Sequence, residues 1–200
     1  MAQTDFYLRN KDCEGMKTLM IIDWICNKFF RKTIYVKIRS DLLSVYSLEN
    51  NVYLEDKPVV AMKIDDKSRR MIVAVGSDAE KSVKADRFLK LCNGFDHPRS
   101  CVGDHEIARG AIAYFISRAL KSRVSVRFIL IIHPLEKLEG GLTNIECKYL
   151  IDMGCSVGAR QVYIWTGDNL TPDELKNLQF PKSKGRLWAD YTLDSKKRGF

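Results

Sequence analysis

The sequence predicts an α/β fold, with a mixed five-stranded sheet and helices packed on it. Residues 33–39 and 42–48 alternate between apolar and polar side chains, which is typical of strands with one buried face. The continuous apolar run of residues 128–132 fits a central strand that is covered on both faces. Helix-capping residues, Asp104 and Thr143, separate the later strands.

The predicted elements run in an order of strands first, followed by alternating helices and strands. The helix from residue 143 is expected to end at Gly154, because glycine is favoured at helix C-termini. Residues 33–75 are expected to form the antiparallel part of the sheet, and the last two strands to be parallel. The predicted strands are 33–39, 42–48, 52–54, 59–64, 71–75, 126–132 and 161–165, and the predicted helices are 79–91, 104–121, 143–153 and 171–178. This order is similar to that of the ribonuclease-H-like unit from which actin-like ATPase subdomains are built.

The chain of 200 residues divides into three predicted parts. Residues 1–32 form an N-terminal amphipathic helical segment, residues 33–181 a single domain, and residues 182–200 a basic tail. The net charge is +8, and the tail contributes six basic and two acidic residues with few apolar ones, so we expect it to be solvated. The six cysteines include no CxxC pair and the three histidines lack zinc-type spacing, so we expect reduced thiols, no metal site and a cytoplasmic protein.

Four short motifs fall in one order along the chain: PVVA at 58–61, GSDA at 76–79, a strand that ends at Pro134, and GARQVYI at 158–164. Together they resemble the MreB family of bacterial rod shape-determining proteins, which are filament-forming relatives of actin. The corresponding family stretches read approximately NEPSVVA, AVGHDA, Val-Pro and GAREV. The resemblance extends from Thr33 to Trp165 and covers only the first half of such a protein. It implies an actin-like domain, and the short chain between residues 88 and 105 implies that the small extra subdomain of these proteins is lacking or reduced to a stub.

The turn between the first two strands lacks the residues of a phosphate-binding loop. It reads Arg39-Ser40-Asp41-Leu42, whereas a backbone that closes on phosphates needs glycine. Asp41 would also repel an incoming anion. We therefore expect no adenine nucleotide and no other cofactor to bind, and no enzymatic activity.

Glu146 is the one candidate catalytic residue. The resemblance places it where the family has a glutamate that orients the attacking water, so it would be a vestigial water-positioning residue. The alternative is structural, because Thr143 and Glu146 have the spacing of a capping box at a helix N-terminus. We favour the structural reading, since a carboxylate without phosphate loops or metal ligands has nothing to hydrolyse.

The N-terminal segment carries the predicted contact surface, because its apolar residues are flanked by basic ones. Such a helix suits a membrane interface, a protein partner, or packing over the sheet of its own domain. Polar residues interrupt the segment, so it is too short and too polar to span a bilayer. The predicted contact residues are Leu19, Ile22, Trp24, Ile25, Lys28, Phe29, Phe30, Arg31 and Lys32.

Two classes of function follow from these observations. The first is a non-catalytic MreB-like module in bacterial cell morphogenesis, with a protein partner or self-association and a position in the cytoplasm or at the inner face of the membrane. The alternatives are a ribonuclease-H-like nucleic-acid-binding domain, or one lobe of an ATPase completed by another chain. A metal-dependent nuclease needs carboxylates on its first and fourth strands, and the first strand has Lys37 and Arg39 instead, so we expect no metal-dependent cleavage. Half of the excess positive charge lies in the tail and not on the folded domain, so we expect no nucleic-acid partner.

Overall fold

The computed structural model describes residues 32–65, 67, 69–121 and 128–193. The strands are β1 (Lys32–Ile38), β2 (Leu43–Ser47), β3 (Val52–Asp56), β4 (Val59–Ile64), β5 (Arg70–Val75), β6 (Lys90–Asn93), β7 (Phe128–Pro134), β8 (Ala159–Gly167) and β9 (Gly185–Thr192). The helices are α2 (Ser77–Ala85), α3 (His105–Leu120), α4 (Asn144–Ser156) and α5 (Pro172–Asn177).

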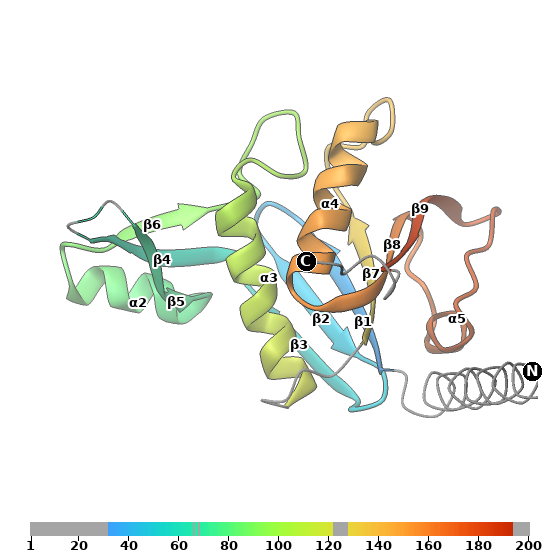
Figure 1. Cartoon of the computed structure of the whole chain (residues 1–200), viewed down its shortest axis with the longest axis horizontal. Coiled ribbons are helices and arrows are strands. Elements are labelled where there is room, and N and C mark those ends of the chain that lie inside the picture. The colour runs from blue at the N-terminus through green and yellow to red at the C-terminus, as the bar shows by residue number, and fades with distance from the viewer. Residues whose placement is uncertain (1–31, 66, 68, 122–127, 194–200) are drawn as a thin grey trace, which may run out of the picture. The chain divides into compact units, whose positions relative to one another are not determined.

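The main sheet has six strands in the order β3-β2-β1-β7-β8-β9 (Figure 1). β1 is parallel to β7, and β7 is parallel to β8, while the other neighbours are antiparallel. Every residue of β7 is buried, as expected for a central strand covered on both faces. The mixed α/β fold and its two late parallel strands are therefore confirmed, but the sheet has six strands and not five.

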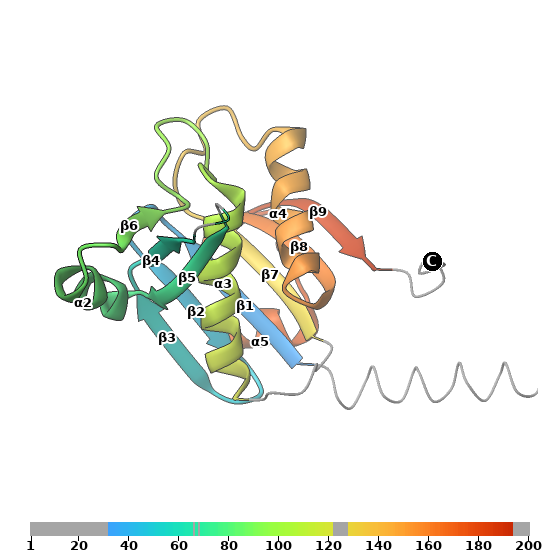
Figure 2. The same cartoon turned by 60° about the vertical axis from the view of Figure 1, so that its left-hand side comes forward.

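Helices cover both faces of this sheet. α3 and α4 lie on one face, and α5 lies on the other face (Figure 2). Phe115 and Ile116 of α3 and Leu150 of α4 are buried in the first of these two cores, and Ile151 is partly buried against it. Gly154 was predicted to end α4, and this is wrong, because the helix continues to Ser156. A Cβ at Gly154 would lie 2.7 Å from a methyl group of Val162, so glycine is there to let the helix approach β8.

A second, three-stranded sheet has the order β5-β4-β6 and packs with α2. Residues 59–75 therefore do not belong to the main sheet, and the predicted helix 79–91 is wrong in its second half, where β6 forms. A second small unit is thus present in residues 59–93, most of it before the interval of residues 88–105 in which we expected the extra subdomain to be lacking or reduced to a stub. Gly76 is the N-cap of α2 and has a φ of +73°, a conformation that favours glycine. The backbone amide of the next residue, Ser77, donates to the Asp56 carboxylate.

The basic tail, residues 182–200, was expected to be solvated, but part of it forms a strand. Residues 185–192 form β9, which is antiparallel to β8 at the edge of the main sheet. The Trp188 indole donates a hydrogen bond of 2.7 Å to the Thr166 hydroxyl, and the Arg186 guanidinium lies 3.8 Å from the Trp188 ring centroid. These contacts fix the strand, and its alternation was too weak in the sequence to be recognised. The last seven residues lie outside the described part of the chain.

Candidate functional site

The turn between β1 and β2 is where a nucleotide-binding actin-like protein would be expected to hold phosphate. It is a tight hairpin turn in which the Arg39 amide donates to the Leu42 carbonyl at 2.9 Å. The Asn93 side-chain amide, at the end of β6, donates to the Ser40 carbonyl at 2.7 Å. The turn is therefore held by its own backbone and by the second sheet.

Glu136 occupies the hydrogen-bond donors of this turn. Because β7 runs parallel to β1, the chain that follows β7 emerges beside the turn. One Glu136 oxygen accepts from the Ser40 amide at 2.9 Å and from the Ser40 hydroxyl at 2.8 Å. The other oxygen lies 3.0 Å from Arg39 Nε. The pKa of Glu136 is lowered, mainly by the hydrogen bond from the Ser40 amide. Burial opposes this shift, while the Ser40 hydroxyl and the Arg39 charge add to it. A carboxylate of the chain itself thus holds the Ser40 donors and the Arg39 guanidinium of this turn.

The space around this contact is small. A cavity of about 10 Å³ borders Ser40, Glu136 and Cys101, and this volume is at the lower limit for a single water molecule. The Lys137 ammonium does not face an anion there, because it donates to the Phe95 carbonyl at 2.9 Å. The enclosed space beside the contact of Ser40 with Glu136 is therefore smaller than a phosphate group.

Glu146 forms the capping box that its spacing predicted. Its carboxylate accepts from the Thr143 amide and hydroxyl, both at 2.9 Å, while the Thr143 hydroxyl accepts from the Glu146 amide at 3.2 Å. Burial raises the pKa of Glu146, but hydrogen bonds from Thr143, and then from the Ser100 side chain and the Cys101 amide, outweigh it and lower the pKa overall. The Glu146 carboxylate therefore caps the N-terminus of α4 and, through Ser100 and Cys101, holds the loop of residues 94–104 in place.

Sequence reasoning missed Glu136. It lies 96 residues from Ser40, and only the parallel pairing of β1 with β7 brings the two together. A usable signal was its position two residues after Pro134, because the carboxyl ends of parallel strands meet at one edge of a sheet.

A buried polar network lies on the opposite face of the sheet, near α5. The Tyr35 hydroxyl hydrogen-bonds His133 Nδ1, and His133 Nε2 contacts the Gly167 carbonyl at 3.0 Å. A carbonyl can only accept, so Nε2 carries the proton and Nδ1 accepts from Tyr35. Burial lowers the pKa of His133 to about 4 and raises that of Tyr35 to about 12, so both groups are neutral at physiological pH.

The predicted N-terminal contact residues lie outside the described residues, apart from Lys32. Lys32 is the first residue of β1 and pairs with Phe128 of β7, so its assignment to the helical segment was wrong. Within the described ranges, no helix is both long and apolar enough to cross a bilayer.

Solved structures share this architecture. MreB5 of Spiroplasma citri bound to ADP matches with a TM-score of 0.52 at 18% identity, over 67% of this chain and 37% of that protein. A non-polymerising A278D mutant of MamK bound to AMPPNP matches with a TM-score of 0.51 at 16% identity, over 68% of this chain and 41% of MamK. The chain has an actin-like fold.

The similarity at these identities concerns the fold alone. The matched part corresponds to about two fifths of the length of either actin-like neighbour. No protein-family model matches the sequence, and no curated protein matches it.

Proposed function

We propose that the chain is a non-catalytic, MreB-like module of the actin-like cytoskeleton in bacterial cell morphogenesis. It acts through protein contacts, with a partner or with further copies of itself, in the cytoplasm or at the inner face of the membrane. The observation that carries this proposal is the contact between Glu136 and Ser40. The Ser40 amide and hydroxyl, which a phosphate would need as donors, already donate to the Glu136 carboxylate. The actin-like fold supports the cytoskeletal class.

The proposal predicts that the protein does not bind Mg-ATP. Phosphate binding depends on backbone amides and positive charge directed at the anion, and here Arg39 and Ser40 already hold Glu136. In isothermal titration calorimetry, we expect no dissociation constant tighter than about 100 μM, which corresponds to about 5.5 kcal/mol of binding free energy.

Comparison of Glu136→Ala with the wild type distinguishes the ways in which this prediction could fail. Glu136→Ala frees the Ser40 donors, and we expect it to remain unable to bind Mg-ATP, since the turn still lacks glycine. Binding by Glu136→Ala but not by the wild type would indicate a nucleotide site that Glu136 blocks. Binding by the wild type would favour the alternative of an ATPase lobe completed by another chain. Glu146→Gln serves as the control, because it weakens the cap of α4 without touching Ser40.

The proposal also predicts that the N-terminal segment carries a contact. If that contact is an anionic membrane, the wild-type protein floats with vesicles that contain phosphatidylserine, and Trp24→Glu with Phe29→Glu abolishes the flotation. A large apolar side chain contributes about 1.5–3 kcal/mol when buried, and each basic residue near the surface about 1 kcal/mol. The matched control is Phe88→Glu, which changes an aromatic residue that is 66% exposed in the described domain. A wild-type protein that does not float would exclude the membrane contact and leave a protein contact as the role of this segment.

A further inference from the structure

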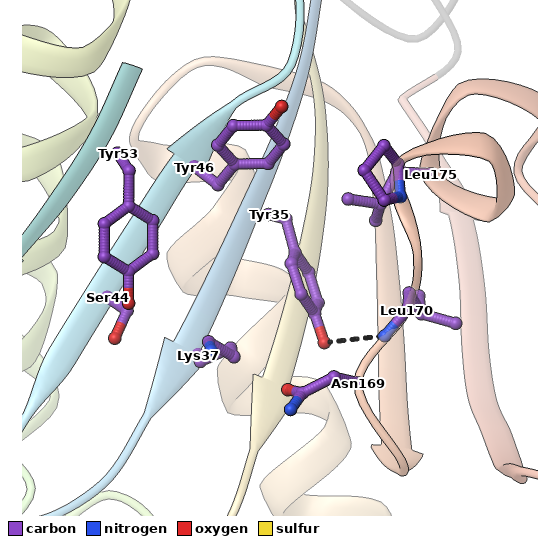
Figure 3. Close-up of a pocket in the computed structure, with 9 residues that line it drawn as sticks. Tyr35, Lys37, Ser44, Tyr46, Tyr53, Asn169, Leu170 and Leu175 are labelled. Carbon is purple, nitrogen blue, oxygen red and sulfur yellow. Dashed lines mark hydrogen bonds between the residues drawn. The ribbon is translucent and has the colours of Figure 1, made fainter. Parts of the chain in front are cut away.

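A cavity of about 280 Å³ lies on the α5 face of the main sheet (Figure 3). This volume is close to the lower end of the range of ligand pockets, about 300–1,000 Å³. It does not touch the β1–β2 turn residues Arg39 and Ser40, so it is a separate site. The polar and aromatic side chains that line it are Tyr35, Lys37, Ser44, Tyr46, Tyr53 and Asn169.

The register of the strands aligns the three tyrosines. Tyr35 on β1 pairs with Tyr46 on β2, and Tyr46 pairs with Tyr53 on β3, so the rings follow one row across three strands. The adjacent row contains Lys37 opposite Ser44. Side chains in neighbouring rows of one sheet face lie within reach of each other. An aromatic row therefore runs beside a positive charge.

The floor of the cavity is fixed by hydrogen bonds. The Tyr35 hydroxyl is bonded to His133, and it lies 3.5 Å from the Leu170 amide that precedes α5 (Figure 3). Tyr35 and Ser44 are 5% and 4% exposed, so neither can turn away. A site whose side chains are held in place loses little conformational entropy when a ligand binds.

Two polar side chains at the cavity have no partner among the residues that the structure describes. Within the described residues, neither the Lys37 ammonium nor the Asn169 amide forms a hydrogen bond or an ion pair through its side chain. The Glu55 carboxylate lies in the same row as Lys37, beyond Ser44, and it accepts from the Tyr53 hydroxyl at 2.8 Å and from the Ser44 hydroxyl at 3.4 Å. Within the described part of the chain, the cavity thus presents a cation and an amide without partners next to three aromatic rings.

We propose that this cavity binds a small planar aromatic carboxylate. Its ring would lie along the row of Tyr46 and Tyr53, where offset stacking is favourable, and its carboxylate would pair with Lys37. Asn169 would donate a second hydrogen bond from the loop that precedes α5. The inference is independent of the proposed contact function, because it uses neither the turn nor the N-terminal segment.

The test uses 2-naphthoate as the probe, followed by calorimetry and saturation-transfer NMR on the full chain. We expect a dissociation constant of about 1 mM or tighter, as for a probe of this size. The uncharged 2-naphthamide and the ringless acetate separate the two parts of the site. Both should bind more weakly than 2-naphthoate, because one lacks the charge and the other lacks the ring.

Substitutions assign the site. Lys37→Met should weaken 2-naphthoate by about tenfold and leave 2-naphthamide within about twofold, since only the charge-assisted contact is lost. Tyr53→Leu should weaken both ligands. Lys63→Met, which changes an exposed lysine on β4 of the second sheet, is the matched control and should change neither. Thermal midpoints of the variants verify folding. Absence of 2-naphthoate binding, or binding that Lys37→Met and Lys63→Met affect equally, would overturn the proposal.

Discussion

Acidification from pH 6.5 to pH 4 is expected to lower the free energy of unfolding by about 3 kcal/mol through His133 alone. Burial is the main cause of the low pKa of this side chain in the folded protein. The hydrogen bond to Gly167 opposes the shift, the charge of Lys37 adds to it, and that of Asp168 opposes it. In the unfolded chain His133 titrates near 6.5, so below that pH the unfolded state binds a proton that the folded state does not. Stability from this group is therefore complete above pH 6.5 and falls as the pH approaches 4.

Urea unfolding at several pH values between 4 and 7 measures this effect. His133→Gln is expected to be less stable at pH 7, because it loses the hydrogen bonds of the imidazole to Tyr35 and Gly167. Its free energy of unfolding should also depend less on pH than that of the wild type. The matched control is His97→Gln, which removes an exposed histidine whose Nδ1 accepts from the Arg99 and Ser100 amides. A change in pH dependence seen with His133→Gln and not with His97→Gln assigns the effect to the buried imidazole. Equal pH dependence in His133→Gln and in the wild type would contradict the assignment.

Trp165→Ala is expected to cost about 3–5 kcal/mol of stability. The Trp165 side chain is fully buried, and its ring packs against Phe180 with a centroid separation of 5.8 Å. Its indole N–H donates to the Asp168 carbonyl at 2.9 Å, so the substitution leaves both a cavity and an unpaired carbonyl. The loss is a large part of the 5–15 kcal/mol that typically stabilises a domain.

The circular-dichroism midpoint in urea measures this loss. Tyr149→Ala removes an aromatic side chain that is 50% exposed on α4, and as the control it should cost under about 1 kcal/mol. A similar cost for the two variants would show that burial of Trp165 is not what stabilises the fold.

The sequence predicted the elements whose residues carry a local signal. β1, β2 and β7 were found from alternation and from the run of buried apolar residues, and α3 and α4 from their caps, Asp104 and Thr143. The role of Glu146 in the capping box followed from a spacing of three residues. These features depend on neighbours in the chain, so a single sequence contains them.

The features that were missed depend on contacts between distant residues. β6 has four residues and β9 is an edge strand with weak alternation, so neither stands out from a loop. In the sequence, Gly154 looks like a residue that ends a helix. Only the close packing of α4 against Val162 shows that glycine is needed there for lack of space. Glu136 bonds Ser40 across 96 residues, and no local pattern links the two.

Cys101 gives the loop of residues 94–104 a chemical property of its own. The thiol is 5% exposed, and burial, then the charge of Glu146, raises its pKa to about 12. Only the thiolate reacts with alkylating reagents, so the thiol is inert while the loop remains closed by the hydrogen bond from the Gly103 amide to the Gly94 carbonyl. When the loop closes faster than the reagent reacts, the rate of Cys101 alkylation therefore equals the fraction of molecules with an open loop multiplied by the alkylation rate of the exposed thiol. The chain thus contains an intrinsic kinetic reporter beside the turn that Glu136 occupies.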